Sequence, residues 1–233
     1  MQLFYAPDIN SERYTFNEEE SKHAVKVLRL KKGDHIHITN GKGILFKTEV
    51  TDPSPKKCSV RILEKTKAFE DKGFRIHIAI APTKNTKRFE WFLEKCTEIG
   101  IDEITPLICE HSERKAIRKE RHEKVLIAAM KQSVKAYLPT LHDPVEFNHF
   151  ISNAEEEFKA IAISDKSQKD HLKKLCVGMK NILVLIGPEG DFSTDEVEGA
   201  ISNGFKRVSL GKSRLRTETA ALVACNIVNT MHD

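Results

Sequence analysis

The sequence contains no run of apolar residues long enough to cross a membrane. Nothing in its 233 residues approaches 18 consecutive apolar residues, and no charged-then-apolar leader opens the chain. The five cysteines are scattered and form no CxxC pair, which is typical of buried thiols in a reducing compartment and not of a disulfide framework. These absences predict a soluble, cytoplasmic protein with no membrane partner.

Several ligand-binding signatures are also missing. The ten histidines include no HExxH motif, so no metal site is predicted. No GxGxxG occurs, which leaves a dinucleotide-binding Rossmann site without support. Gly211-Lys212-Ser213 is like the end of a phosphate-binding P-loop, but Lys206 stands where that motif needs its first glycine. A nucleotide-like pocket in this chain must therefore be of another kind.

The charge is mildly basic and unevenly distributed. The formal net charge is +4, which by itself does not establish a nucleic-acid partner. Residues 1–72 hold 14 basic and 11 acidic side chains, a net charge of 14 − 11 = +3. The segment 111–135 concentrates eight basic residues against three acidic ones. Such a patch can steer a polyanion, although a solvated charged face is the ordinary explanation.

The first third of the chain predicts a small, mostly β unit. Alternating residues predict strands at 3–5, 14–16, 35–39, 44–50 and 58–63, the third and fourth joined by a turn. Asn17 begins a short helix whose apolar face carries Ala24, Val27 and Leu28. Several short strands with one small helix indicate a barrel.

From about residue 73 the pattern changes to strands that alternate with helices, and we place a domain boundary at 70–73. Strands are predicted at 75–81, 103–109, 158–163, 181–186 and 207–210. Helices are predicted at 118–136, at 168–176, from Thr217 onward, and along an apolar stripe of Phe89, Phe92, Leu93, Cys96 and Ile99. This alternation is typical of an α/β domain with a mainly parallel sheet.

Two of these strands run into glycine-bearing turns that each open a helix. Strand 181–186 leads into Gly187-Pro188-Glu189-Gly190-Asp191, after which Ser193 to Glu196 spells a capping box. Strand 207–210 leads into Gly211, and a helix follows. Because the carboxyl ends of parallel strands share one edge of a sheet, the two turns predict a binding crevice made mostly of backbone. One such turn alone would indicate no more than a change of direction.

The same two stretches carry a resemblance to a known family. GPEGDF at 187–192, followed by LGKSRLRTETAAL at 210–222, resembles the signature of the RsmE family of 16S ribosomal RNA uracil-N3 methyltransferases, within the SPOUT class. Weaker matches are HAVKVLR at 23–29, KCTEIG at 95–100 and QS at 132–133. The resemblance therefore covers nearly the whole chain.

The resemblance implies a fold, a cofactor and partners. It implies a PUA-like RNA-binding β-barrel over 1–72 and a SPOUT α/β methyltransferase domain with a trefoil knot over 73–233. It also implies S-adenosyl-L-methionine as the methyl donor, the 16S rRNA of the small ribosomal subunit as the partner, and a homodimer. The implied cofactor-binding residues are Leu185, Gly187, Pro188, Glu189, Gly190, Leu210, Gly211, Leu215 and Thr217.

Methylation at uracil N3 needs a base and a cation. N3 carries a proton, and when that proton leaves, negative charge spreads onto O2 and O4. Arg216, which opens the last helix, is the candidate cation, and Glu218 and Glu189 are candidate bases or organisers. Acidic residues in the first turn of a helix also commonly stabilise the helix dipole. That purely structural role therefore stays open for both glutamates.

Basic residues in three stretches of the chain are candidates for contact with RNA phosphates. They are Arg29, Lys31, Lys32, Lys84, Lys87, Arg88, Arg114, Arg118 and Arg121. The alternatives are cations that stabilise a helix C-terminus and charged faces that only meet water.

The chain departs from the family pattern at four positions. Asp191 stands where a second glycine is usual, and aspartate tolerates left-handed φ angles, so the turn can persist. Ser213 and Arg214 stand where Arg and Ile are usual, and Lys135 replaces an Arg after the QS pair. Two other functions also stay open: a SPOUT methyltransferase for another RNA site, and a non-catalytic RNA-binding ribosome assembly factor.

Overall fold

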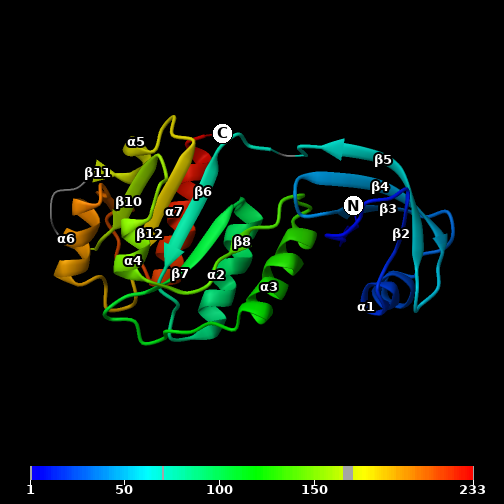
Figure 1. Ribbon diagram of the computed structural model, residues 1–233, viewed down its shortest axis with the longest axis horizontal. Coiled ribbons are helices and arrows are strands. Elements are labelled where there is room, and N and C mark those ends of the chain that lie inside the picture. The colour runs from blue at the N-terminus through cyan, green and yellow to red at the C-terminus, as the bar shows by residue number, and fades with distance from the viewer. Residues whose placement is uncertain (1, 70, 165–169, 233) are drawn as a thin grey trace. The chain divides into compact units, whose positions relative to one another are not determined.

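The computed structural model describes residues 2–69, 71–164 and 170–232 (Figure 1). The chain divides into two compact units, Met1–Asp71 with Met130–Leu138, and Lys72–Ala129 with Pro139–Asp233. The predicted boundary at 70–73 assigns 130–138 to the second domain, whereas in the structure this segment packs with the first unit. Among the described residues no helix is both long and apolar enough to span a bilayer.

The first unit is built on a five-stranded sheet in the order β1-β3-β4-β5-β2. Its strands are β1 (Leu3–Tyr5), β2 (Arg13–Thr15), β3 (His35–Thr39), β4 (Ile44–Asp52) and β5 (Ser59–Lys67). Alternation in β3 buries Ile36 and Ile38 and leaves His35 exposed. The predicted strands of this region are therefore confirmed, with small shifts at their ends. Within the described residues β1 and β2 are edge strands, so the barrel is open between them.

The small helix of the first unit differs from the prediction in its second half. Asn17 caps α1 (Glu18–Lys22) as predicted, accepting a 2.9 Å hydrogen bond from the backbone N–H of Glu20. The chain then continues as a π-helical turn, η1 (His23–Val27). Its wider turn rotates the following side chains, so Ala24 is buried but Val27 is 66% exposed. The predicted burial of Val27 is wrong for this reason.

The segment 130–138 joins the first unit through hydrogen bonds to the end of β3 and to the turn between β3 and β4. The carbonyl of Ala136 accepts from the Thr39 hydroxyl and the Gly43 N–H, both at 3.0 Å. The N–H of Leu138 donates to the Gly41 carbonyl at 2.9 Å. A Cβ at Gly43 would lie 2.3 Å from the Tyr137 ring, so this close approach requires glycine.

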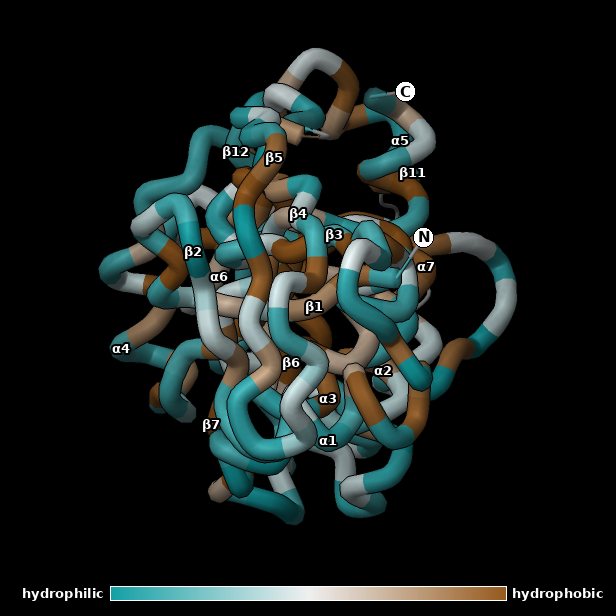
Figure 2. The backbone as a smooth tube through the Cα atoms, turned by 90° about the vertical axis from the view of Figure 1, so that its right-hand side faces the viewer, coloured by the Kyte–Doolittle hydropathy of each residue, from teal (hydrophilic) through white to brown (hydrophobic). Residues whose placement is uncertain are grey.

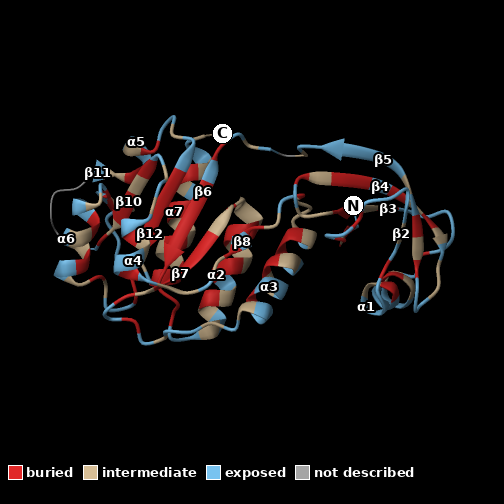
Figure 3. Cartoon of the chain, viewed as in Figure 1, coloured by how far each residue is buried: buried red, intermediate tan, exposed pale blue. Residues whose placement is uncertain are grey.

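The second unit contains a parallel sheet in the order β11-β13-β10-β12-β6-β7-β8, with β9 beside β7. Its strands are β6 (Arg75–Ile80), β7 (Glu103–Ile108), β8 (Thr140–Leu141), β9 (Val145–Glu146), β10 (Phe158–Ala162), β11 (Asp170–His171), β12 (Asn181–Ile186) and β13 (Lys206–Ser209). Figure 3 shows β6 and β7 buried almost throughout, as strands covered on both faces should be. The predicted α/β class with a parallel sheet is confirmed.

The helices that follow β6 are α2 (Thr86–Ile99), α3 (Lys119–Gln132), α4 (Phe147–Ser152), α5 (Leu172–Leu175), α6 (Thr194–Ser202) and α7 (Thr217–Thr230). His122 of α3 packs against Phe89 of α2. Leu183 and Leu185 of β12 share a core with α4 and α6. α2 and α7 pack together, and α7 lies on β6 and β12, whose alternate side chains point to that face. Figure 2 colours the backbone by hydropathy and shows hydrophobic stretches between hydrophilic ones along the chain.

Two predicted helices differ from the structure. The helix predicted at 118–136 is α3, which ends at Gln132, and Val134 has a left-handed φ of 60°. Of the helix predicted at 168–176, residues 168–169 lie outside the described residues, and the rest forms β11 and the short α5. All five cysteines are buried free thiols, which confirms the prediction made from their spacing.

Candidate active site

The two glycine turns lie at one edge of the parallel sheet. β10 pairs with β12 on one side and with β13 on the other, in parallel in both cases. The turn after β12 and the turn after β13 are therefore separated by one strand, or roughly 10 Å at the usual spacing of neighbouring strands. The predicted placement of both turns at a shared edge is confirmed.

The turn after β12 has the local geometry that its sequence predicts. The N–H of Asp191 donates to the Pro188 carbonyl at 2.9 Å and closes the turn. Asp191 adopts a left-handed φ of 64°, as expected for a position where glycine is usual. The capping box is present, since Ser193 Oγ accepts from the Glu196 N–H at 3.3 Å and Glu196 Oε2 accepts from the Ser193 N–H at 2.9 Å.

The three glycines of these turns are required for different structural reasons. A Cβ at Gly187 would lie 3.1 Å from the Phe192 ring, and one at Gly190 would lie 3.1 Å from Cβ of His111. Packing against protein neighbours therefore explains both. Gly211 has a φ of 136° and no atom within 4 Å of its would-be Cβ. Open space beside bare backbone occurs at Gly211, where a ligand could approach.

Glu189 joins the turn after β12 to the loop after β6. Its Oε1 accepts from the backbone N–H of Lys84 at 3.0 Å, and the Lys84 carbonyl accepts from Arg114 Nη2 at 3.0 Å. The Lys84 ammonium lies 2.7 Å from Glu113, and that hydrogen bond raises the pKa of Lys84. One carboxylate thus helps to set the position of the neighbouring loop.

Sequence reasoning missed several residues at this edge. His111 Nδ1 donates to the Asp191 carbonyl at 3.0 Å, and Glu196 Oε1 accepts from the Glu110 N–H at 2.8 Å. Ser164 donates to Asp191 Oδ2 through its hydroxyl and its backbone N–H. Each of Glu110, His111 and Ser164 follows the carboxyl end of a predicted strand within three residues, and that position was the available signal.

The amino end of α7 brings two predicted catalytic residues together with a basic one. Arg216 is the exposed N-cap residue, and its side chain makes no cap hydrogen bond. Glu218 is buried, and its Oε1 lies 3.7 Å from Arg88 Nε. Its Oε2 is buried without a hydrogen-bond partner among the described residues. A buried carboxylate oxygen of this kind is suited to accept from a ligand donor.

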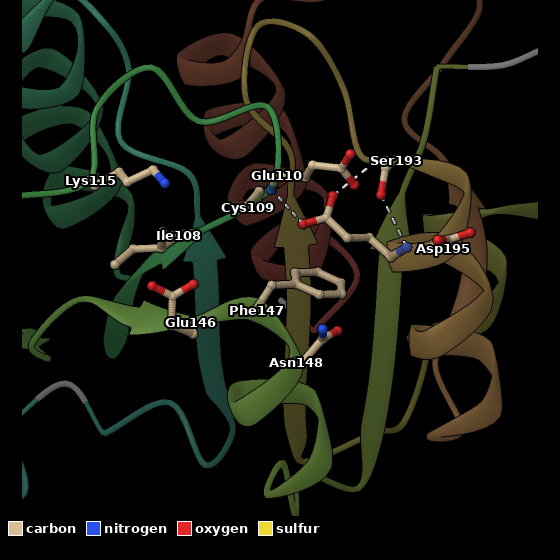
Figure 4. Close-up of a pocket in the computed structure, with 10 residues that line it drawn as sticks. Ile108, Cys109, Glu110, Lys115, Glu146, Phe147, Asn148, Ser193 and Asp195 are labelled. Carbon is tan, nitrogen blue, oxygen red and sulfur yellow. Dashed lines mark hydrogen bonds between the residues drawn. The ribbon is translucent and has the colours of Figure 1, made fainter.

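A cavity of ≈ 370 Å³ lies beside this edge, between the end of β7 and the starts of α4 and α6 (Figure 4). It is lined by Ile108, Cys109, Glu110, Lys115, Glu146, Phe147, Asn148, Ser193, Asp195 and Glu196. Burial raises the pKa of Cys109 strongly, so its thiol stays protonated at neutral pH. A second cavity of ≈ 230 Å³ is lined partly by Ile163, Asp191 and Arg207. Neither cavity is lined by a predicted cofactor-binding residue.

Comparison with known proteins finds two family models that match this chain. An RNA methyltransferase PUA domain matches residues 16–63, and an RNA methyltransferase domain matches residues 70–229. The ribosomal RNA small subunit methyltransferase E of Buchnera aphidicola is 31% identical, over 99% of this chain and 93% of that protein. The chain belongs to the ribosomal RNA small subunit methyltransferase E family, RsmE.

Solved structures agree with membership of the RsmE family. A probable rRNA-methyltransferase from Porphyromonas gingivalis superposes with a TM-score of 0.93 at 42% identity, covering 100% of this chain and 98% of that one. A ribosomal RNA small subunit methyltransferase E from Neisseria gonorrhoeae, bound to S-adenosyl methionine, has a TM-score of 0.88 at 26% identity. That match covers 99% of this chain and 97% of the Neisseria chain.

Some of the basic residues predicted to contact RNA have a carboxylate or carbonyl partner within this chain, and others do not. Arg121 Nε lies 2.5 Å from Glu90, while Lys84, Arg88 and Arg114 have the partners given above. Lys87 and Arg118 are exposed and have no carboxylate within 4 Å in the described part of the chain. In the first unit, Arg29, Lys31 and Lys32 are all exposed. Paired cations are less available to phosphates than unpaired ones.

Proposed function

We propose that this protein transfers a methyl group from S-adenosyl-L-methionine to N3 of a uridine in the 16S rRNA of the small ribosomal subunit. The observation that carries the proposal is the placement of the GPEGD and LGKSRLR turns on either side of β10, at one edge of the sheet. Membership of the RsmE family supports it, since the named relatives are ribosomal RNA small subunit methyltransferases.

The cofactor would be held by the backbone and apolar side chains of the two turns, at the residues predicted above. Open space at Gly211 and the half-buried side chains of Leu210 and Leu215 fit an adenosyl group. Leu185 is fully buried in the core, so its part would be to shape the end of β12. When bound, S-adenosylmethionine supplies an electrophilic methyl group.

Arg216 and Glu218 would act on the uracil. The exposed guanidinium of Arg216 can stabilise the negative charge that develops on O2 or O4. The unpartnered oxygen of Glu218 can accept the hydrogen bond, and then the proton, of N3–H. Glu189 already accepts from the Lys84 backbone, so its proposed role is to organise the turn.

The remaining assignments follow from the family. We propose that 1–72 is the RNA-binding domain, completed by 130–138, and that the rest of 73–233 is the methyltransferase domain with a trefoil knot. We also propose a cytoplasmic homodimer that binds RNA phosphates through exposed cations such as Arg29, Lys87 and Arg118.

Nucleoside mass spectrometry of 16S rRNA from cells that lack this protein tests the function. We expect 3-methyluridine to disappear and to return when the wild-type gene is supplied. Loss of a different methylated nucleoside would favour the SPOUT methyltransferase for another RNA site. An unchanged profile, together with no calorimetric heat on adding S-adenosylmethionine, would favour the non-catalytic assembly factor.

A further inference from the structure

Asp191 makes contacts that glycine could not make in its place. Its Oδ2 accepts from the backbone N–H of Ser164 at 3.3 Å and also from the Ser164 hydroxyl. Its Oδ1 accepts from the Phe192 N–H at 2.9 Å. The carboxylate therefore has a partner in the segment that follows β10, in addition to the local contact that steadies its own left-handed backbone.

Ser164 occupies a central place at this edge of the sheet. It follows β10, the strand that lies between β12 and β13 and so between the two glycine turns. The preceding residue, Ile163, donates its N–H to the Val208 carbonyl of β13 at 3.4 Å. The end of β10 is thus tied to β13 through Ile163 and to the turn after β12 through Asp191.

The backbone of Asp191 adds a connection to β7. Its carbonyl accepts from His111 Nδ1, as described above, so loops from β7, β10 and β12 meet at this one residue. A glycine at this position would keep the backbone contacts and lose the carboxylate contacts. It would also suit the φ of 64° better than aspartate does.

We infer that Asp191 is a positioning residue whose carboxylate, through Ser164, presets the crevice that takes the adenosyl group of the cofactor. The inference rests on the proposed function, because it needs the crevice to be the cofactor site. Preorganised contacts raise affinity by lowering the cost of ordering a loop on binding. The Asp191 carboxylate would thus hold the turn in place by hydrogen bonding before the cofactor binds, which glycine at this position could not do.

The test compares Asp191→Gly with the wild-type chain in two measurements. Calorimetry with S-adenosylmethionine should show a Kd raised roughly 10-fold, the scale of one or two lost hydrogen bonds. Chemical denaturation should show a stability close to wild type, because relief of the left-handed backbone offsets the loss of the carboxylate hydrogen bonds. A loss of stability with an unchanged Kd would show a merely structural role and would overturn the inference.

Ser164→Ala provides the matched second variant. It removes the hydroxyl contact alone, should raise the Kd in the same direction, and decides the matter if Asp191→Gly does not fold. In the double variant Ser164→Ala should raise the Kd no further, since Asp191→Gly already removes the contact with the Ser164 hydroxyl. Asp195→Asn, at an exposed acid three residues beyond Phe192, should keep the wild-type Kd.

The two proposals fail in different ways. Absence of any binding heat from the wild-type chain would contradict the proposed function. Wild-type binding with an unchanged Kd in both Asp191→Gly and Ser164→Ala would overturn only the positioning role of Asp191.

Discussion

Arg88 Nε on α2 lies 3.7 Å from Glu218 Oε1, a buried carboxylate at the amino end of α7. α2 and α7 pack together, so this pair links two helices on one face of the sheet. Removing the guanidinium leaves the buried carboxylate without its charge partner.

Arg88→Met should therefore lower the free energy of unfolding by about 1–2 kcal/mol, measured by urea denaturation. Lys87→Met, on the exposed face of the same helix, is the control and should stay within about 0.5 kcal/mol of wild type. Adding Glu218→Gln to Arg88→Met should recover part of the loss. Equal stability of Arg88→Met and Lys87→Met would show that the pair contributes nothing.

Arg216→Ala should separate methyl transfer from cofactor binding. Loss of a charge-stabilising donor should reduce kcat at least ~100-fold, while the calorimetric Kd for S-adenosylmethionine stays close to wild type. Arg214→Ala, two residues earlier and also exposed, should affect kcat much less. If Arg216→Ala lost binding and transfer to the same extent, the catalytic assignment would be withdrawn.

The buried imidazole of His122 should make the folded chain less stable in mild acid. The imidazole is buried against Phe89, and neither ring nitrogen has a hydrogen-bond partner among the described residues. Burial, aided by Arg121 and Arg114 and opposed by Glu90, lowers the pKa of His122 below 6.5. Below about pH 6.5 the unfolded chain therefore binds more protons than the folded chain, so the free energy of unfolding falls as the pH drops.

His122→Phe should remove this pH dependence. The wild-type free energy of unfolding should fall by up to about 1.4 kcal/mol per pH unit below pH 6.5, and the variant should lose correspondingly less. Denaturant titrations between pH 7.5 and 5 measure the difference. His149→Phe, at an exposed position on α4, should follow the wild-type curve. Parallel curves for wild type and His122→Phe would contradict the prediction.

Gly43→Ala tests the packing of the segment 130–138 against the first unit. The new methyl group would meet the Tyr137 ring at 2.3 Å, and the φ of 80° would add backbone strain. We expect a loss of about 3 kcal/mol from strain and overpacking together. Gly33→Ala has a φ of 93° but open space, so it should lose only about 1–2 kcal/mol. Equal losses would mean that Tyr137 does not pack there in solution.

RNA affinity should fall steeply as salt rises. Each phosphate contact contributes about 0.7–0.9 to the slope of log K against log salt, so Arg118→Gln should reduce that slope by about this amount. Arg121→Gln should reduce it less, because Arg121 is already paired with Glu90. Filter binding to 16S rRNA across salt concentrations measures both slopes. A flat salt response of the wild-type protein would remove the phosphate contacts from the proposal.

Local patterns were enough to predict most elements and their ends. Asn17 and Ser193 begin helices because a side-chain oxygen caps nearby N–H groups, an interaction within four residues. Val27 was mispredicted because a π-helical turn changes the register that a regular α-helix assumes. The glycine turns were found by the same local rules, and Asp191 took the left-handed backbone expected of it.

The sequence by itself determined the parallel α/β class, the two turns and the family, because periodicity, turn chemistry and motifs are properties of neighbouring residues. Only the tertiary structure decided that β10 lies between the turns and that Ser164 and His111 meet Asp191. It also decided that 130–138 completes the first unit. These contacts join residues far apart in the chain, and strand order, which no local pattern encodes, brings them together.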